Sequence, residues 1–238
     1  MEIIIQPTLW DDSYFNLKTG RISLLHQLDV KDVQELKEKS KDFDLVVIDN
    51  RLCHLHNERA ISKIDNCYLC DLQVRFELAC NEVEPQIGAY TTVGNNLDFS
   101  EECLAISKVA YQYSRFRMDP YLDQEKAKKI YIEWCKNAFN QVERYFVLFK
   151  KNNRIEGYLL FHIDESIVIE LMAVCPKSQK HGIGESMMNH LIKYAKEKHI
   201  NTIKVGTQAN NTQAIRFYQK RGFMLQEMHS IYHYWPHR

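Results

Sequence analysis

The sequence predicts an α/β protein in which helices cover the faces of a mixed β-sheet, and two observations support this. Over residues 101–238, apolar patterns of helical and strand period follow one another in the order ααβββαβαβ. Over residues 1–100, short strand-like runs surround a single helical pattern. We therefore expect a smaller N-terminal α/β domain over residues 1–100 and a larger α/β domain over residues 101–238.

The first hundred residues are expected to hold short strands around one helix. The strand-like runs cover residues 2–5, 21–25, 45–48 and 73–78, and the helix covers residues 30–39. Asp29 precedes this helix and is a residue type that favours the N-cap position. Residues 83–100 contain a cluster of proline, glycine and asparagine residues, which favour turns, so we place the domain boundary close to residue 100.

The elements beyond residue 100 follow from the same periodicities. Helices are predicted over residues 101–113, 124–139, 184–199 and Thr212–Lys220, and strands over 145–150, 157–161, Ile167–Val174, 202–207 and 230–234. Asn152 and Asn153 separate the first two of these strands, and asparagine tolerates the left-handed backbone of a tight turn, which predicts a hairpin.

Composition narrows the classes of partner. The 31 Lys+Arg residues balance the 31 Asp+Glu residues, so the basic excess typical of nucleic-acid binding is missing and no nucleic-acid partner is expected. No apolar run approaches the roughly 18 residues needed to cross a bilayer, so no membrane partner is expected. The seven cysteines are an odd number and no signal-peptide pattern follows Met1, which favours a cytoplasmic protein with reduced thiols.

The segment after the strand Ile167–Val174 has the pattern of an anion-binding site. A loop carrying Gly182 and Gly184 leads directly into the helix predicted from residue 184. The first backbone N–H groups of a helix have no intrahelical partner, and the helix dipole is positive there. Glycine removes the Cβ atom that would keep a ligand away from the backbone. We expect this loop to bind a phosphate or pyrophosphate.

Two motifs give the chain a resemblance to a known superfamily. The first is Gln179-Lys180-His181-Gly182-Ile183-Gly184, preceded by Leu171-Met172-Ala173-Val174-Cys175-Pro176. The second comprises Asn211, Ala214, Tyr218, Gly222 and Phe223. In this order, over residues 101–238, they resemble the GNAT superfamily of CoA-dependent N-acyltransferases. The resemblance implies a mixed central sheet that splays at its middle and is flanked by helices.

Further stretches are more specifically similar to dTDP-fucosamine acetyltransferase and related nucleotide-amino-sugar N-acyltransferases. They are Leu9-Trp10-Asp11-Asp12-Ser13-Tyr14-Phe15-Asn16-Leu17, Tyr113-Ser114-Arg115-Phe116-Arg117-Met118-Asp119-Pro120-Tyr121, Tyr131-Ile132-Glu133-Trp134, Thr207-Gln208-Ala209-Asn210-Asn211-Thr212 and Tyr234-Trp235. Asn16 stands where those proteins have glycine, and asparagine tolerates a left-handed backbone better than most residues. This similarity extends the resemblance to nearly the whole chain.

The resemblance implies acyl-CoA, either acetyl-CoA or a longer acyl-CoA, as the co-substrate. The residues that it assigns to this cofactor are Met172, Ala173, Val174, Gln179, Lys180, His181, Gly182, Ile183, Gly184, Glu185, Ser186, Asn211 and Tyr218. Asn211 precedes a predicted helix and suits an N-cap equally well, and both roles remain open.

Tyr218 and Glu170 are the catalytic candidates. Tyr218 matches the superfamily tyrosine, and its ordinary pKa of about 10 suits donation to a thiolate whose parent pKa is about 8.5. A core tyrosine that only packs is the alternative. Glu170 lies four residues before Val174, where relatives carry an acid that holds a water near the amine. A salt-bridge role for Glu170 is the alternative.

Tyr111, Arg115, Arg117 and Tyr121 are the candidates for binding the acceptor. Arginine offers paired donors for a diphosphate, and aromatic rings stack on a base. The alternative is a surface loop whose arginines reach into solvent.

A zinc site is the other arrangement considered. Its ligands would come from Cys53, His54, His56, Cys67 and Cys70. The CxxC pair leads into a strand-like run and the first group lacks the usual spacing, so we expect no metal.

The predicted function is transfer of an acyl group from acyl-CoA to the amine of a dTDP-linked 6-deoxy amino sugar, by direct attack of the amine on the thioester. The product would feed polysaccharide biosynthesis. One alternative is a GNAT enzyme acting on another amine, in a peptide, an antibiotic or a small metabolite. Another is a CoA-binding sensor without turnover, against which Tyr218 and the intact glycine loop argue. For the oligomeric state, a homodimer and a monomer are both retained as hypotheses.

Overall fold

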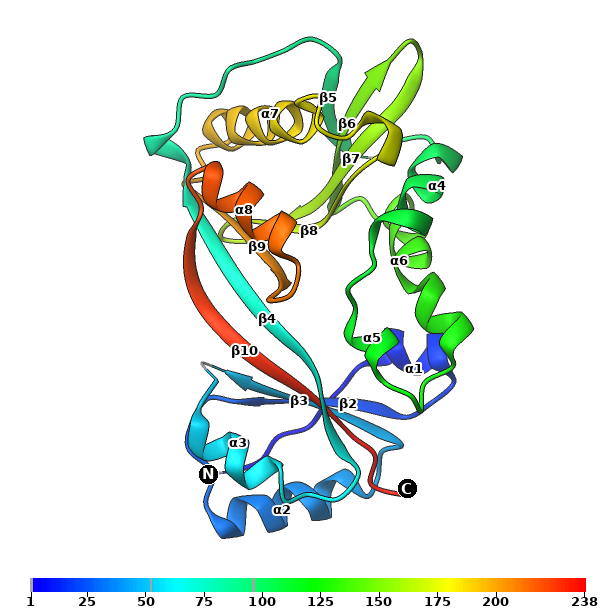
Figure 1. The fold of residues 1–238 in the computed structure, drawn as a ribbon, viewed down its shortest axis with the longest axis vertical. Coiled ribbons are helices and arrows are strands. Elements are labelled where there is room, and N and C mark those ends of the chain that lie inside the picture. Colours follow the sequence, from blue (N-terminus) through cyan, green and yellow to red (C-terminus); the bar gives the residue numbers. More distant parts are fainter. Residues whose placement is uncertain (1, 52, 96) are drawn as a thin grey trace.

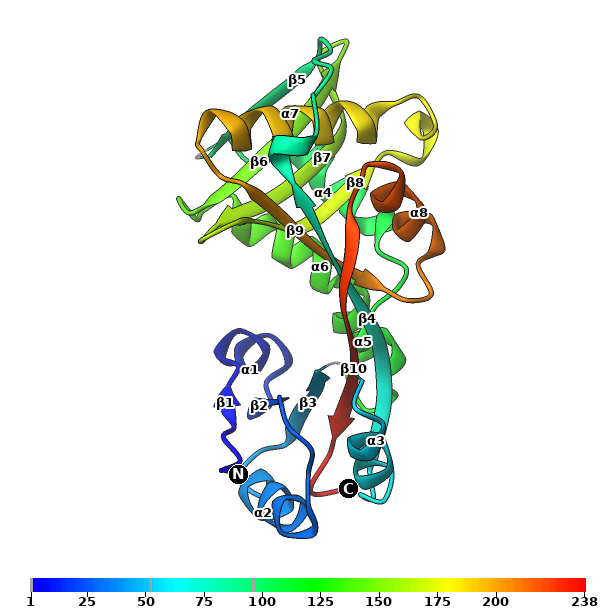
Figure 2. The same cartoon turned by 90° about the vertical axis from the view of Figure 1, so that its left-hand side faces the viewer.

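The computed structural model describes residues 2–51, 53–95 and 97–238 and contains one ten-stranded mixed sheet flanked by helices. The strand order is β1-β2-β3-β10-β4-β9-β8-β7-β6-β5. The strands are β1 (Gln6–Pro7), β2 (Thr19–Leu24), β3 (Leu45–Arg51), β4 (Cys67–Ala79), β5 (Thr91–Asn95), β6 (Arg144–Lys151), β7 (Arg154–Ile163), β8 (Ile167–Val174), β9 (Thr202–Gln208) and β10 (Met224–Tyr234). Figures 1 and 2 show an elongated molecule with an upper and a lower part.

Eight α-helices and two short 3₁₀-helices accompany the described strands. The helices are α1 (Leu9–Phe15), α2 (Val30–Ser40), α3 (Leu55–Ile61), α4 (Glu101–Ala110), α5 (Arg115–Met118), α6 (Gln124–Ala138), α7 (Ile183–Glu197) and α8 (Thr212–Lys220), with η1 (Cys80–Glu82) and η2 (Pro176–Ser178). Among the described residues, none of these helices is both long and apolar enough to span a bilayer.

The upper part has a three-layer arrangement because its strands are apolar on both faces. The long helix α7 packs over β5, β6 and β7 on one face, as Figure 1 shows. Its buried residues include Met187, Leu191 and Ala195, spaced by four along the helix. Helices α4 and α6 cover the other face, where Phe146 and Leu160 are buried. Strands β6 and β7 join at a turn in which Asn152 and Asn153 both have positive φ, which confirms the predicted hairpin.

The lower part has its own core on one face of β2, β3 and β10. Helices α2 and α3 lie below these strands in Figure 1, and Ile22, Ile48 and Tyr232 belong to the buried cluster between them. Helix α2 begins at the predicted cap. The Asp29 side chain accepts from the Asp32 backbone N–H at 2.8 Å, and the Asp32 side chain accepts from the Asp29 backbone N–H at 2.9 Å. This reciprocal pair is a capping box.

Two long strands connect the parts. Strands β4 and β10 run antiparallel from the upper to the lower part, side by side in both Figures 1 and 2. Strand β10 also pairs with β3, so the end of the chain lies inside the sheet formed by its beginning. Helices α1, α5 and α6 meet beside this junction, where Phe15, Phe116 and Trp235 are buried together. The described strands on both sides of residue 100 thus form one sheet, and the two-domain division stays a prediction.

Some predicted elements differ from the structure. Residues 2–5 are not a strand, and β1 covers Gln6–Pro7 instead. Strands β4 and β10 extend well beyond the predicted residues 73–78 and 230–234. The two strands pair with each other, and each also pairs with a second strand, β4 with β9 and β10 with β3. The prediction missed β5, α1, α3 and α5, which are short elements with little periodicity of their own.

Candidate active site

The central feature of the site is the place where β8 and β9 part. The two strands pair in parallel only from Ile167 opposite Ile203 to Ile169 opposite Val205. Beyond this point β8 continues alongside β7, whereas β9 continues alongside β4 to Gln208. The predicted splay of the sheet is therefore present. From Leu171 onward, the edge of β8 that faces β9 has no strand partner among the described residues.

A cavity of about 730 Å³ opens at this wedge and extends to helix α1. Side chains from both parts of the molecule line it. They are Thr8, Leu9, Trp10, Asp11, Arg21, Asp71, Gln73, Ala110, Tyr111, Gln112, Tyr113, Arg115, Phe116, Tyr131, Trp134, Asn137, Gln141, Arg144, Ile169, Glu170, Leu171, Met172, Val205, Gly206, Thr207, Gln208, Asn211, Ala214 and Tyr218.

Aromatic rings form a row along one wall of the cavity. The Tyr111 and Tyr131 ring centroids are 4.9 Å apart, and Tyr131 stacks on Trp134 at 6.2 Å with an interplanar angle of 8°. Trp134 in turn lies 6.3 Å from Trp10 of helix α1. Such faces pack against flat or partly apolar ligands, including nucleobases.

Charged side chains of both signs line the same cavity. Arg115 pairs with Asp11 at 3.3 Å, and Arg144 pairs with Glu170 at 3.0 Å. Arg21 binds Asp49 at 2.6 Å. Each of these three arginine side chains is thus held by an acid from a neighbouring element, which fixes its orientation.

Asp71 is a cavity residue that these ion pairs do not include. Burial raises the pKa of Asp71, against the opposing effects of a hydrogen bond with Gln208 and the charge of Arg115. An acid in this state binds a cationic or hydrogen-bonding ligand readily, and an acceptor amine is one such ligand.

Tyr218 lies on α8 at the wedge, with its ring in contact with Phe76, Phe217 and Phe223. Burial raises the pKa of Tyr218 well above its ordinary value. Among the described residues none hydrogen-bonds to its hydroxyl, and the residue lines the cavity. The hydroxyl therefore stays protonated and remains available to a ligand. Packing and proton donation are compatible in this position.

Glu170 lines the cavity but is held by three neighbours. Its Oε1 atom lies 3.0 Å from Arg144 Nε and 2.6 Å from His162 Nδ1, and its Oε2 atom accepts from Trp134 Nε1 at 3.2 Å. This matches the salt-bridge alternative and leaves the role of Glu170 as a base a prediction.

Asn211 combines two contacts. Its side chain accepts from the Ala214 backbone N–H at 3.2 Å, as an N-cap of α8 does, and its Nδ2 donates to Thr207 Oγ1 at 3.2 Å. Asn211 also lines the cavity, so the capping role does not exclude contact with a ligand.

The glycine loop lies at the end of β8, beyond the cavity. In the described chain, no backbone N–H from Lys180 to Glu185 donates to a backbone carbonyl, and helix α7 begins at Ile183. Lys180 and Gly182 have φ values of 64° and 78°, so the chain adopts a left-handed backbone twice within this loop. Gln179, Lys180, His181 and Gly182 are exposed. Free amides at a helix N-terminus suit a pyrophosphate.

The two glycines have different reasons to be glycine. A Cβ on Gly182 would meet nothing within 4 Å, so its positive φ is what requires glycine. A Cβ on Gly184 would lie 3.3 Å from the side chains of both Met172 and Phe217. Close packing of α7 against these residues is therefore the structural constraint at Gly184.

The remaining residues assigned to the cofactor divide into two groups. Met172 lines the cavity, whereas Ala173 is buried and Val174 half-buried on β8. Glu185 forms an ion pair with Arg221, and Ser186 Oγ hydrogen-bonds to Thr91 Oγ1 of β5 at 2.9 Å. The side chains of this second pair thus bind other parts of the protein.

Of the four acceptor candidates, Tyr111 and Arg115 line the cavity. Arg117 and Tyr121 lie outside its lining: Arg117 donates to the Lys128 carbonyl at 3.4 Å, and Tyr121 hydroxyl lies 3.3 Å from the Tyr68 hydroxyl. Arg117 and Arg115 are two residues apart on the short helix α5 and so point in different directions.

The hydroxyl of Tyr111 belongs to a directed chain. Ser107 Oγ donates to the Cys103 carbonyl at 2.8 Å and therefore accepts from Tyr158 OH at 2.7 Å. Since a hydroxyl has one proton, Tyr158 OH accepts in turn from Tyr111 OH at 2.9 Å. The free capacity of the Tyr111 oxygen is that of an acceptor, which suits an amine or hydroxyl donor.

Within the described residues, one group of side chains has the proximity of metal ligands: Cys70, Asp119 and His233. Both ring nitrogens of His233 are already in hydrogen bonds, and Arg115 NH1 lies 2.9 Å from its Nε2. A guanidinium at that position repels a cation and occupies the lone pair that would bind it. The group fits a hydrogen-bond network better than a metal. The expected absence of zinc stays a prediction.

Sequence reasoning missed several cavity residues, notably Asp71, Gln73 and Arg21. Alternation along β4 carries a signal for the first two, because Val74 and Phe76 are buried in the core while Asp71 and Gln73 face the cavity. Arg21 carries no comparable signal.

Comparison with known proteins is consistent with this geometry. Residues 108–223 match the family model described as "Acetyltransferase (GNAT) family". The chain is 30% identical over 138 residues to the spore coat polysaccharide biosynthesis protein SpsD of Bacillus subtilis, covering 58% of this chain and 48% of that protein. It is 28% identical over 95 residues to the [Ribosomal protein bS18]-alanine N-acetyltransferase of Escherichia coli, covering 38% and 64%. The chain thus spans about half the length of SpsD.

Solved structures share the fold over most of the chain. A GCN5-related N-acetyltransferase from Kribbella flavida has a TM-score of 0.61 at 12% identity, covering 90% of this chain and 80% of that one. Another, from Sphaerobacter thermophilus, has a TM-score of 0.58 at 10% identity, covering 92% and 73%. The segment matched by the family model contains the parting strands, the glycine loop and Tyr218, so residues 108–223 of this chain resemble the GNAT acetyltransferase family in both sequence and structure.

Proposed function

We propose that this protein transfers an acyl group from acyl-CoA to the amine of a nucleotide-linked amino sugar, specifically a dTDP-linked 6-deoxy amino sugar. The observation that carries the proposal is the reach of the cavity. It extends from the wedge between β8 and β9 to Trp10 and Asp11 of helix α1, so it has room for a ligand much longer than a small amine.

Acyl-CoA fits the acyl side of the site. The free amides between Lys180 and Glu185 suit its pyrophosphate. The unpaired edge of β8 offers backbone groups to its extended arm, in the direction from the loop toward the cavity. When bound, acyl-CoA supplies an activated thioester. A backbone N–H on this edge stabilises the negative charge that develops on the acyl oxygen.

Tyr218 returns a proton to the departing thiolate. Its hydroxyl is protonated and free to contact a ligand at the wedge. Burial raises the pKa of Tyr218, and the same low-polarity surroundings disfavour the thiolate, so the driving force for proton transfer is retained. Asp71 and the acceptor oxygen of Tyr111 are available to the amine on the other side.

The acceptor side suits a sugar nucleotide for two reasons. The aromatic row from Tyr111 to Trp10 provides faces for a base or a deoxysugar, and Arg115 provides donors for an anionic oxygen. The similarity to SpsD, a spore coat polysaccharide biosynthesis protein, agrees with a sugar substrate.

The direct test is an acyl-transfer assay read by mass spectrometry. The protein is incubated with acetyl-CoA or longer acyl-CoA and with a panel of dTDP-amino sugars, UDP-amino sugars and free amino sugars. We expect acylation of a dTDP-linked 6-deoxy amino sugar in preference to its free sugar. Equal activity on the free amino sugar would contradict the nucleotide requirement, and absence of transfer to every amine would favour a CoA-binding sensor.

A peptide α-amine is the second candidate, favoured by the similarity to the ribosomal-protein alanine N-acetyltransferase. Peptides with an N-terminal alanine belong in the same panel. If they are acylated faster than every amino sugar, the second candidate replaces the first.

A further inference from the structure

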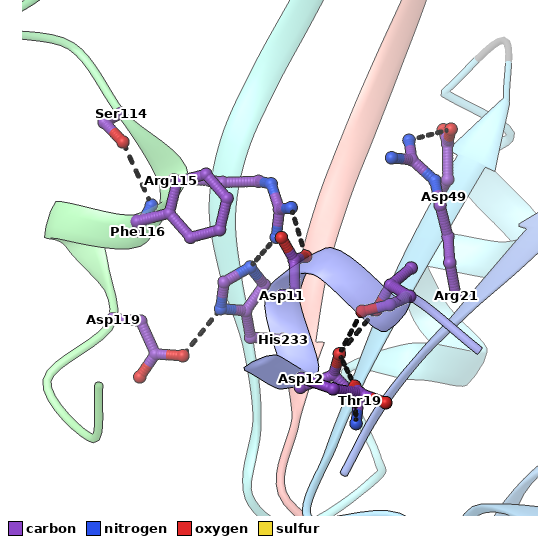
Figure 3. A network of polar contacts seen from close by, with 11 residues as sticks. Asp11, Asp12, Thr19, Arg21, Asp49, Ser114, Arg115, Phe116, Asp119 and His233 are labelled. Carbon is purple, nitrogen blue, oxygen red and sulfur yellow. Dashed lines mark hydrogen bonds and ion pairs between the residues drawn. The ribbon is translucent and has the colours of Figure 1, made fainter. Parts of the chain in front are cut away.

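His233 on β10 is fully buried, and both of its ring nitrogens are engaged in hydrogen bonds. Its Nδ1 lies 2.6 Å from Asp119 Oδ2, and its Nε2 lies 2.9 Å from Arg115 NH1. The exposed fractions of His233 and Asp119 are 0% and 1%. Figure 3 shows the imidazole between the carboxylate and the guanidinium, with Asp11 on the far side of Arg115.

The partners determine the tautomer of the ring. A guanidinium only donates hydrogen bonds, so Nε2 must accept and cannot carry a proton. The proton therefore lies on Nδ1, which donates it to Asp119. Asp119 is itself fixed, because Oδ1 accepts from the Tyr121 backbone N–H at 2.9 Å and Oδ2 accepts from Trp235 Nε1 at 3.0 Å.

The neutral ring is consistent with its surroundings. Burial lowers the pKa of His233, the charge of Arg115 lowers it further, and the acids Asp119 and Asp11 act in the opposite direction. Cys70 on β4 also faces this group, and burial raises the pKa of its thiol to about 12, so it is uncharged.

Three contacts then fix the guanidinium of Arg115. NH1 donates to His233, NH2 donates to Asp11 at 3.3 Å, and the group lies 3.9 Å above the Phe116 ring. Arginine has five N–H donors, so within the described part of the chain some of them are left without a hydrogen bond while the residue lines the cavity.

We propose that His233, in the tautomer set by Asp119, is a positioning residue that orients Arg115 to bind the anionic group of the acceptor. This rests on the proposed function only for the identity of that anion, a nucleotide diphosphate. Without the acceptor atom Nε2, Arg115 would lose one of its anchors and the cavity would lose a fixed donor.

A matched pair of variants tests the role. In His233→Gln the side-chain oxygen reaches the place of Nε2 and still accepts from Arg115. In His233→Asn the amide reaches only the place of Nδ1, so the contact with Asp119 is kept and the one with Arg115 is lost. Both remove the same ring from the core. We expect the acceptor KM to rise about tenfold in His233→Asn and to stay within about threefold of the parent value in His233→Gln. The kcat should change little in both variants. Equal acceptor KM values in the two variants would overturn the proposal.

Asp119→Asn tests the tautomer with almost no change of shape. An amide at the place of Oδ2 donates to Nδ1, which moves the ring proton to Nε2, where it opposes the Arg115 donor. We expect an increase of the acceptor KM of about tenfold, with the KM for acyl-CoA unchanged. An acceptor KM equal to that of the parent would overturn the proposal.

Nitrogen-15 NMR of the histidine rings gives a readout that needs no substrate. The His233 signal, identified by its loss in His233→Gln, should show a proton on Nδ1 alone in the parent. A proton on Nε2, or on both nitrogens, would overturn the positioning role. Calorimetry with dTDP tests the ligand separately: failure of the parent to bind dTDP would overturn the proposed acceptor class and the diphosphate assigned to Arg115.

Discussion

The two ends of the cavity are built in different ways. The acyl side uses two short stretches of chain, one from the end of β8 through the glycine loop into α7 and one from Asn211 to Tyr218 in α8. The acceptor side brings together Asp11, Arg115 and His233, which are separated by 104 and 118 positions. A contiguous site can be recognised from a short motif, whereas an assembled one depends on the strand order of the whole sheet.

Strand β10 illustrates the second case. It lies between β3 and β4, with His233 opposite Val47 and Tyr68. Nothing near His233 in the sequence indicates a partner at Arg115. The comparison therefore predicts that single substitutions on the acyl side act through local chemistry, whereas those on the acceptor side act through a network.

The largest effect is expected on the acyl side, in Tyr218→Phe. This change removes the proton donor and keeps the ring that packs against Phe76 and Phe223. We expect kcat to fall roughly 10²-fold or more, the usual range for acid–base catalysis, with little change in the melting temperature. Steady-state assays at saturating substrates measure it. Tyr194→Phe, near the C-terminal end of α7 beside Tyr145, is the control. Unchanged kcat in Tyr218→Phe would assign the residue a packing role.

On the acceptor side, Arg115→Ala should raise the acceptor KM roughly tenfold to a hundredfold, because a charge-assisted hydrogen bond contributes about 1.5–3 kcal/mol. The KM for acyl-CoA should stay nearly constant. The sequence alone predicts the same for Arg117, but the structure directs Arg117 toward the Lys128 carbonyl outside the cavity lining. Arg117→Ala is therefore the matched control. Equal KM increases in both variants would show that the assembled site differs from the one described.

The strands and helices at the centre of the fold could be predicted from the sequence. The set of distant residues that meet in the cavity could not. Strand Ile167–Val174 and helix Thr212–Lys220 match their predicted bounds, since strong periodicity defines each one locally. Glu170, Met172 and Tyr218, which the sequence singles out, line the cavity, and their roles stay predictions. Asp71 and Trp134 line the cavity only because β4 and α6 are packed beside it, and tertiary packing decides that arrangement.

Gly182 tests the loop on the acyl side of the cavity, because only its backbone conformation requires glycine. A β-branched residue at its φ of 78° is strained by about 1–3 kcal/mol, so Gly182→Val should shift the loop amides and raise the Kd for CoA roughly tenfold. Gly94→Val is the control, because a Cβ at Gly94 meets Leu97 at an ordinary 3.6 Å. Calorimetry with CoA measures both. Tight CoA binding by Gly182→Val would remove the loop from the acyl site.

The smallest effect concerns the stability of the sheet beneath the acceptor side. Burial alone would raise the pKa of Asp49, but hydrogen bonds with His229 and Arg21 lower it to about 2, from 3.8. A carboxyl with a depressed folded-state pKa stabilises the fold above its unfolded pKa, and this contribution is lost as the pH falls through the folded value. We expect Asp49 to contribute about 2 kcal/mol at pH 7 and about half of that at pH 3. Urea unfolding of the parent and Asp49→Asn at several pH values measures the difference, which should narrow between pH 4 and pH 2. A difference that stays constant over this range would show that the carboxylate charge does not stabilise the acceptor side.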